Sequence, residues 1–163
     1  MIINMIIKIK NYFSKTLALI FAVFLLSQTA VFSVDKNYKT EIINMVNSAR
    51  AERNLPPLEQ DKRLDILADK KAKIMAEEEN LSHTAGGYNS FSDLIKEAGI
   101  KYLAVGENIA RNWRTPEEVM EAWLNSSGHR ANIMNKKFTK IGVGKAVNSK
   151  GDIYWVQLFI KER

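Results

Sequence analysis

The sequence of 163 residues contains no cysteine, only three prolines and only two histidines. The absence of cysteine excludes disulfide bonds and a lipid-bearing cysteine, so the packing of the core has to stabilise the fold. Internal repeats and low-complexity tracts are also absent, which excludes a repeat array. With 46% apolar and 26% charged residues, the chain has the length and composition of one globular domain.

The first 33 residues lack acidic side chains. They carry three lysines, then an unbroken apolar run over Leu17–Leu26, then small and polar residues up to Ser33. This order predicts a secretory signal peptide over residues 1–33, cleaved after Ser33, and a single domain over residues 34–163. The alternative is an uncleaved membrane anchor. We therefore expect a secreted or cell-surface protein that contacts a membrane only if the signal is retained.

Basic residues outnumber acidic ones, by 24 to 18, which gives a net charge of +6. Three of the lysines belong to the predicted signal peptide, so 21 basic and 18 acidic residues remain after cleavage and the net charge is +3. The remaining lysines and arginines are interleaved with glutamates and form no stripe. This distribution argues against nucleic acid as a partner, while an anionic cell wall or membrane surface stays compatible with it.

Helical periodicity is clearest in the first half of the predicted domain. Apolar residues at helical spacing predict a helix over Thr40–Arg53, which the prolines of Asn54–Leu58 terminate. A second helix is predicted to begin after Asp61, whose side chain is a suitable N-cap. Its apolar stripe consists of Leu64, Leu67, Ala68, Ala72 and Met75.

Capping signals predict two further helices. A short one begins at Ser90 or Ser92 and ends near Gly99. Another begins with a capping box formed by Thr115 and Glu118. We expect this last helix to stop at Gly128, in the left-handed conformation that glycine favours.

The two closing segments predict strands. In Lys140–Val147, glycine and alanine leave one face bare, which invites either close packing or a ligand. Both faces of Ile153–Ile160 are apolar, so we expect helices to cover this strand on both sides. Trp123 and Trp155 fit apolar faces and are predicted in the core. Gln157, alone among apolar neighbours, should be buried and hydrogen-bonded.

Three polar groups stand in or beside breaks between predicted elements, namely His83, Glu107 and His129. Two imidazoles and a carboxylate, with water in a fourth position, are a familiar zinc set. The spacing alone does not select it, because no H-E-x-x-H pattern is present. Two structural histidines and a capping or salt-bridging glutamate are the alternative. A nucleophilic serine is a weaker hypothesis, because no strand-turn-helix elbow presents the serines concerned, Ser82, Ser126 and Ser127.

Five motifs in order resemble the CAP superfamily of cysteine-rich secretory, antigen 5 and pathogenesis-related 1 proteins, in a cysteine-free bacterial form. The motifs are "NMVNSAR", "LSHT", "GENIA", "AWLNSSGHRANIM" running into "KIGVG", and "YWVQLF". The resemblance covers Tyr38 to Ile160. It implies an α+β fold, a three-layer α-β-α sandwich around a central, mainly antiparallel sheet. It also implies a surface cavity with a His-Glu-Glu-His tetrad, which holds a divalent metal in some members.

Carried over by position, the resemblance makes His83, Glu107 and His129 cavity residues. The family's second glutamate falls on Ser126 here, which leaves the tetrad with a single carboxylate. The resemblance implies that His83 and His129 are the candidate ligands of a metal such as zinc. It also implies that Asn108 and Arg130 support the loops around the cavity. Asn47 and Arg50 are instead expected to be structural and to tie down the first helix.

Two classes of function follow from this resemblance. The first is a binding module whose cavity holds an extracellular lipid, peptide or wall fragment, with or without a metal. The second is a metal-dependent hydrolase that uses His83, Glu107 and His129, with Glu107 as the candidate catalytic base. We favour the binding module, because the sequence shows neither a separate nucleophile nor an oxyanion hole.

Overall fold

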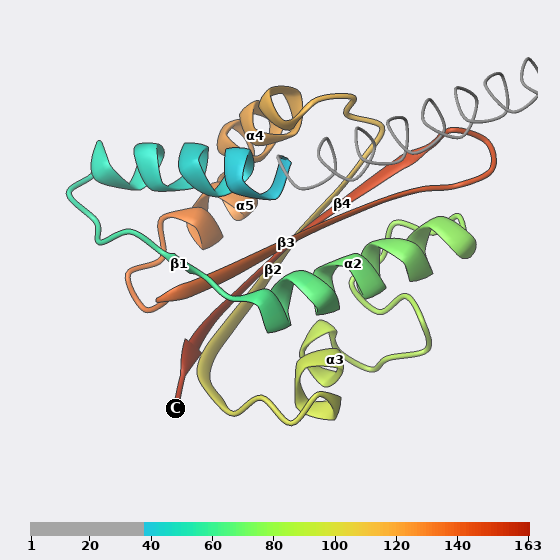
Figure 1. Ribbon diagram of the computed structural model, residues 1–163, viewed down its shortest axis with the longest axis horizontal. Helices are drawn as coiled ribbons and strands as arrows, with labels where there is room; N and C mark the ends of the chain where they lie inside the picture. The colour runs from blue at the N-terminus through green and yellow to red at the C-terminus, as the bar shows by residue number, and fades with distance from the viewer. Residues whose placement is uncertain (1–37) are drawn as a thin grey trace, which may run out of the picture. The chain divides into compact units, whose positions relative to one another are not determined.

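The computed structural model describes residues 38–163 (Figure 1). The predicted signal peptide and its cleavage site at Ser33 lie outside the described residues. A helix is described over residues 38–51 and is called helix 38–51 below. The other elements are β1 (Glu59–Gln60), α2 (Lys62–Glu77), α3 (Phe91–Glu97), β2 (Tyr102–Arg111), α4 (Pro116–Asn125), α5 (Ser127–Ile133), β3 (Lys140–Val147) and β4 (Ile153–Glu162). No helix within residues 38–163 is long and apolar enough to cross a membrane.

The sheet has the strand order β1-β3-β4-β2, which places β2 at one edge. The long strands β3, β4 and β2 pair in antiparallel fashion, while the two-residue β1 runs parallel to β3. Gln157 at the centre of β4 pairs with Val143 on one side and with Asn108 on the other. The prediction of a mainly antiparallel sheet is therefore confirmed.

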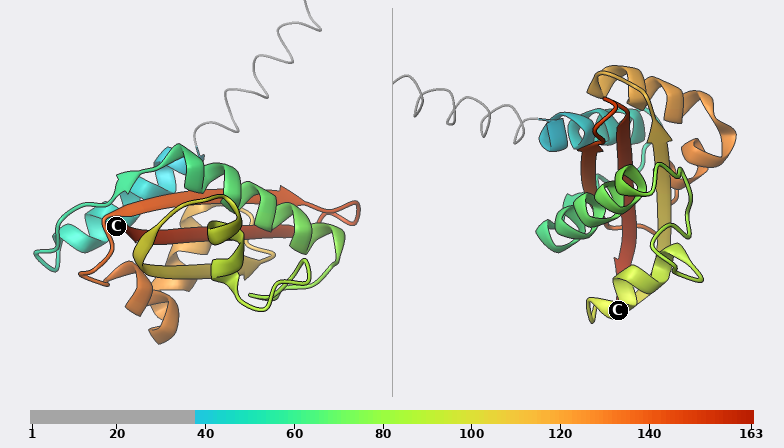
Figure 2. Two further views of the ribbon diagram at one scale, coloured as in Figure 1. Left: turned by 90° about the horizontal axis from the view of Figure 1, so that it is seen from below. Right: turned by 90° about the vertical axis from the view of Figure 1, so that its right-hand side faces the viewer.

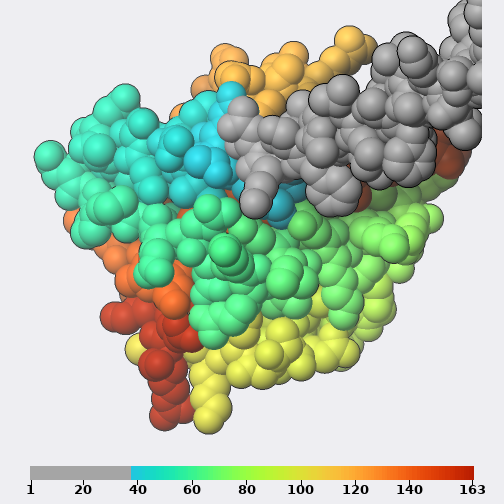
Figure 3. Space-filling model, in the orientation of Figure 1, coloured from blue at the N-terminus to red at the C-terminus, as the bar shows by residue number. Residues whose placement is uncertain are grey.

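Helices cover both faces of the sheet (Figure 1). One core cluster joins helix 38–51, α4 and α5 to a sheet face that includes Trp155 and Phe159. A second cluster joins α2 and α3 to the opposite face, which includes Tyr154, Val156 and Leu158. In the space-filling view, green atoms of α2 lie at the front of the molecule, and orange and red atoms of the closing segments are visible at the lower left (Figure 3). The predicted three-layer α-β-α sandwich is confirmed.

Strand β4 shows why both layers are needed. Its residues from Tyr154 to Ile160 are all buried, so an uncovered face would expose large apolar side chains to water. The prediction for Gln157 is confirmed, because the side chain is fully buried and its Oε1 accepts a hydrogen bond of 3.0 Å from Asn108. Trp123 and Trp155 lie in the core as predicted.

Helix α2 packs unusually close to β3. A Cβ atom added to Gly142 would lie 2.3 Å from the backbone carbon of Leu64, and one added to Gly144 would lie 2.1 Å from that of Ala68. Real Cβ atoms do not approach backbone atoms this closely, so both positions require glycine. The bare face of β3 therefore receives a helix backbone, which selects close packing over the alternative of a ligand.

The same helix also completes the free edge of β3. The carboxylate of Asp65 accepts the backbone N–H of Val143 at 2.8 Å, and Asp69 accepts that of Lys145 at 3.3 Å. Among residues 38–163, β1 is the strand that pairs with this edge of β3, and it reaches only Lys140 and Ile141. Acidic side chains of α2 thus accept the hydrogen bonds that a neighbouring strand would accept. This protects the edge of β3 from pairing with a strand of another molecule.

Two sequence-based expectations are wrong or incomplete. The capping box of Thr115 and Glu118 is present, but α4 ends at Asn125 rather than at Gly128. Ser126 has an extended backbone, and Gly128 lies within the first turn of α5, where it is not among the glycines with positive φ. Strand β2 was not predicted, because its centre carries the polar residues Glu107 and Asn108 in place of an alternating apolar pattern.

The two glycine environments make a matched test of this packing. We expect Gly144→Ala to lower the free energy of unfolding by at least about 2 kcal/mol, because the new methyl group overlaps the backbone of α2. Gly128→Ala has open space around its Cβ and gains helix propensity, so we expect it to be neutral or to stabilise by about 0.5 kcal/mol. Urea unfolding of both variants measures the difference. Equal stabilities would contradict the close approach of α2.

Candidate functional site

His83 and Glu107 form the centre of the candidate site. The imidazole Nδ1 lies 2.6 Å from Oε1 of Glu107, although the two residues are 24 positions apart in the chain. The side chain of Glu107 is fully buried, whereas that of His83 is 53% exposed. An ionised carboxylate can only accept, so Nδ1 of His83 then donates and Nε2 is the nitrogen left for a ligand. The pair therefore fixes the orientation of His83 and, when the imidazole is neutral, its tautomer.

A buried lysine of α2 holds the loop that carries His83. The Nζ of Lys71 donates to the backbone carbonyls of His83 and Ala85, at 2.9 and 3.0 Å. Lys71 is 1% exposed, and burial lowers its pKa, while the nearby charges of Glu107 and Glu78 favour its charged form. This ammonium group therefore fixes the backbone of the His83 loop and places a positive charge near the buried carboxylate.

Two asparagines attach α5 to β2. Asn108 donates to the backbone carbonyl of His129 at 3.1 Å, and its own Oδ1 accepts from Asn132 at 2.9 Å. Asn132 also donates to the backbone carbonyl of Glu107 at 3.0 Å. The third residue of α5, His129, is thereby held beside the same strand that carries Glu107.

His83 and His129 approach β2 from different layers. Glu107 and Ile109 point to the layer of α2 and α3, where His83 contacts Glu107, whereas Asn108 and Ala110 point to the layer of α5. Burial lowers the pKa of His129, and the charge of His83 lowers it further. The two imidazoles are thus close enough for the charge of His83 to lower the pKa of His129, while their convergence with Glu107 in one cavity stays a prediction.

The remaining predicted cavity residues lie on the segment between α4 and α5. Ser126 is half-buried and joins the two helices, and its side chain makes no capping hydrogen bond. Arg130 donates to the backbone carbonyl of Leu124, which ties α5 to the last turn of α4. The roles of Ser126 in a cavity and of Arg130 as a supporting residue stay predictions.

The side chains of the candidate site do not form a zinc site. No group of three His, Asp or Glu side chains among residues 38–163 is arranged to hold a metal ion. One oxygen of Glu107 is engaged by His83, and the glutamate that the family has at the position of Ser126 is missing. The residues as arranged therefore do not fit a preformed three-ligand metal site.

Sequence reasoning overlooked Lys71 and Asn132. Lys71 falls on the apolar stripe of α2, between Ala68 and Met75 at helical spacing, and a lysine at such a position signals a buried cation. Asn132 follows His129 by three residues, which places both on one side of α5. These signals become informative only once the partners are known, which are the loop carbonyls of His83 and Ala85 for Lys71 and strand β2 for Asn132.

A fully buried carboxylate thus orients an exposed histidine at a sheet edge of a cysteine-free α-β-α sandwich. Residues 43–159 match the model of the cysteine-rich secretory protein (CAP) family. The chain therefore belongs to the CAP family, and the resemblance noted from the motifs is confirmed.

Two proteins of Bacillus subtilis strain 168 are similar in sequence. YkwD is 42% identical over 123 residues, which cover 76% of this chain and 47% of YkwD. The membrane protein YlbC is 35% identical over 121 residues, which cover 74% of this chain and 34% of YlbC. The chain thus spans less than half the length of either relative.

Solved structures share the fold. An extracellular protein of Bacillus anthracis that contains an SCP domain has a TM-score of 0.70 and 28% identity, with coverage of 78% of this chain and 41% of that one. An outer surface protein of Borrelia burgdorferi has a TM-score of 0.71 and 24% identity, with coverage of 76% and 92% respectively. The second likeness shows the fold alone.

We expect His129 to titrate below its ordinary pKa of 6.5, because burial and the positive charge of His83 both disfavour its protonated form. The chain has only two histidines, so imidazole NMR signals recorded across pH give both titration curves, and His83→Ala assigns them. We expect His83→Ala to raise the pKa of His129, because one of the two causes is removed. An unchanged pKa in that variant would contradict the coupling around β2.

Proposed function

We propose that the protein is an exported CAP-domain binding module in which His83, oriented by Glu107 and neighboured by His129, binds an extracellular ligand. The proposed ligand is a lipid, a peptide or a cell-wall fragment. The observation that carries the proposal is the 2.6 Å contact between a half-exposed imidazole and a fully buried carboxylate. This contact pre-organises a hydrogen-bonding group at the surface, which reduces the entropy lost when a ligand binds.

The orphaned oxygen of Glu107 supports a binding role. Its Oε2 is buried and has no hydrogen-bond partner among residues 38–163. A buried polar atom without a partner costs free energy, so such atoms often serve a function. A ligand that donates a hydrogen bond near His83 would satisfy it.

The chemistry of the site favours binding over hydrolysis. Within residues 38–163 no serine hydroxyl is hydrogen-bonded to a histidine, and the hydroxyl of Ser82 is engaged by Thr84. Glu107 is already engaged in holding His83, so it would have to serve as both base and support. We therefore assign the pair to ligand recognition.

Export is the second part of the proposal. It rests on the lysine-rich and apolar start of the chain and on the similarity to the extracellular protein of Bacillus anthracis. We expect the native protein to begin near Val34 and to be found outside the cytoplasm. The intact mass of the protein from the producing cells measures this, and a cytoplasmic species that retains residues 1–33 would contradict it.

Binding can be tested with a soluble muropeptide, a short-chain phospholipid and a neutral peptide as probes, each followed by NMR titration of the histidine signals. We expect one of these probes to shift the signals of His83. Glu107→Gln keeps the shape of the buried side chain but weakens its charged hydrogen bond to His83, so we expect affinity to fall about 10-fold. Lys161→Gln, an exposed change on β4, is the control and should leave affinity unchanged.

The same samples separate binding from hydrolysis. After incubation, mass spectrometry should recover the bound probe with its mass unchanged. Turnover of the probe that is lost in both His83→Ala and His129→Ala would overturn the binding module and favour the hydrolase. The absence of any shift at His83 with all three probes would contradict the assignment of this site.

A further inference from the structure

A groove lined by basic residues is the strongest unassigned feature of the molecule. It has a volume of about 400 Å³ and lies where segment 52–58, which follows helix 38–51, passes beside α5 (Figures 1 and 2). This volume is within the range of sites that hold ligands. Its lining includes the basic residues Arg53, Arg130 and Lys136 and the apolar residues Leu55, Ala131 and Met134. Neither histidine nor Glu107 lines it, so this basic groove is separate from the histidine site.

The cations of the basic groove have no counter-charge within the described residues. Arg53, Arg130 and Lys136 are exposed, and none of them forms an ion pair with another residue among 38–163. No acidic residue lines the groove. Elsewhere on the surface cations are paired, as Lys140 is with Glu162. Positive charges that share a groove repel one another, and an anion bound between them would remove this cost.

A buried arginine joins the two walls of the groove. Arg50 is fully buried, and its Nη1 donates to the backbone carbonyls of Ile133 and Asn135 at the end of α5, at 2.7 and 3.0 Å. Its Nε donates to the carbonyl of Pro56 in segment 52–58, at 2.9 Å. These acceptors are neutral, so the charge of Arg50 is not cancelled by a carboxylate. Arg50 therefore fixes the walls relative to each other and adds positive charge behind them.

The positive charge is specific to this groove. The neighbouring groove between helix 38–51 and α4 is lined by Glu52, Glu117 and Glu121 and by no basic residue. Two adjacent surfaces of one helical layer thus carry opposite charge. An anionic ligand is attracted to the basic groove and repelled by its neighbour.

The side chains of the basic groove suit phosphate oxygens. Arg130 donates from Nη1 to the carbonyl of Leu124, which orients the guanidinium group and leaves most of its five N–H donors for a ligand. Guanidinium groups match the oxygens of phosphate geometrically, and the ammonium group of Lys136 adds a point charge. Leu55 and Met134 are half-buried and supply apolar surface in the same groove.

We propose that the basic groove binds an extended phosphodiester polyanion, an anionic polymer of the cell wall. The charged groups of such a polymer belong to its backbone, so successive phosphates would contact the arginines and Lys136 while the uncharged links contact Leu55 and Met134. A bilayer fits less well, because a plane of head groups meets protruding residues rather than the lining of a groove. Assignment of the polymer to the wall rests on the export proposed above, whereas binding does not depend on the histidine site.

Methionine-methyl NMR of the purified protein locates the binding site, with a short glycerol-phosphate oligomer as the probe. Met134 lines the basic groove, and Met75, buried in the layer of α2, is the internal reference. We expect the oligomer to shift the signal of Met134 alone, with an affinity that falls as the salt concentration rises. The imidazole signals of His83 should not move. This readout separates failure at the histidine site from failure at the basic groove.

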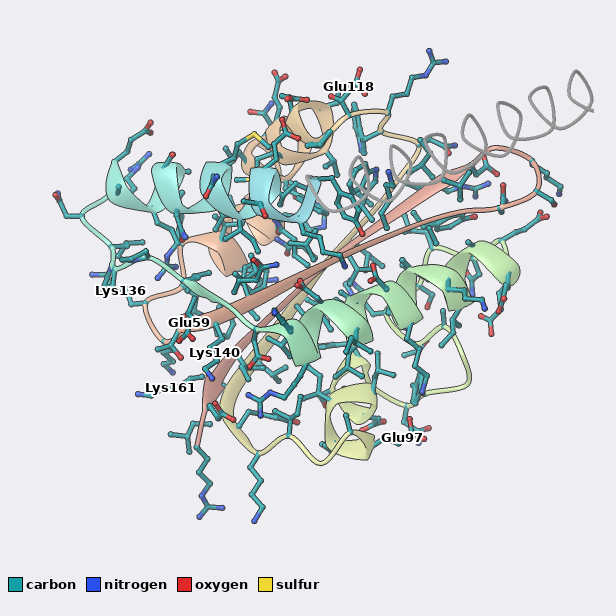
Figure 4. The ribbon with its side chains drawn as sticks, in the orientation of Figure 1. Glu59, Glu97, Glu118, Lys136, Lys140 and Lys161 are labelled. Carbon is teal, nitrogen blue, oxygen red and sulfur yellow. The ribbon has the colours of Figure 1, made fainter. Side chains whose placement is uncertain are left out.

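Charge variants measure the contribution of the lining. Arg53→Gln together with Lys136→Gln removes two cations whose side chains make no hydrogen bond within residues 38–163, so the fold should be retained. Figure 4 shows Lys136 beside segment 52–58, where Arg53 also lies. Because each exposed ion pair contributes modestly, we expect this double variant to bind the oligomer about 10-fold more weakly at low salt.

The matched control is Arg114→Gln together with Lys101→Gln. It also removes one arginine and one lysine, both of them exposed and both outside the basic groove. Lys101 lies between α3 and β2, and Arg114 lies between β2 and α4. We expect this control pair to leave affinity for the oligomer unchanged, because a general effect of net charge is the same in both double variants.

Several outcomes would overturn the proposal. One is the absence of a shift at Met134, and another is equal binding by the two double variants while thermal unfolding shows that both are folded. Equal shifts by a glutamate oligomer of the same charge would show a general anion surface. Tighter binding of single-stranded DNA, or binding to phosphatidylglycerol vesicles without binding of the oligomer, would assign the groove to a different partner.

Discussion

The close approach of α2 to β3 is the contact on which the rest of the structure depends. Gly142 and Gly144 allow the helix backbone to contact the strand directly, and Asp65 anchors the helix to the strand's edge. Because α2 is fixed in this way, Lys71 reaches the carbonyl groups of the loop that follows the helix. The position of His83 is thus set by glycines about sixty residues further along the chain.

Side chains close the outer edge of β2 and the part of β3 that the two-residue β1 leaves unpaired. At β3 the carboxylates of α2 accept backbone N–H groups. At β2 the side chain of Asn132 donates to the carbonyl of Glu107, and that of Trp123 donates to the carbonyl of Ile109. The contacts of Asn132, together with the hydrogen bond from Asn108 to the carbonyl of His129, also hold α5 against β2. Edge protection and assembly of the candidate site are therefore one feature of this fold.

The helical layer formed by helix 38–51, α4 and α5 carries two surfaces of opposite charge. Glutamates rim the groove between helix 38–51 and α4, whereas arginine and lysine line the groove on α5. The total charge of the chain describes neither surface, since it averages over both. Electrostatic complementarity to a partner is thus decided locally, by which helix faces lie side by side.

The sequence by itself determined the features that depend on neighbouring residues. The capping box of Thr115 and Glu118 needs contacts across three positions, and the two apolar faces of β4 are visible within a single strand. The motifs identified the family without any coordinates.

Tertiary structure alone decided the positions of β2, Lys71 and His129. Glu107 and Asn108 interrupt the apolar pattern of β2, and the partners that make them favourable, His83 and Gln157, lie 24 and 49 residues away. Local propensity cannot encode such contacts, because burial of a polar group becomes favourable only when the fold supplies its hydrogen-bond partner.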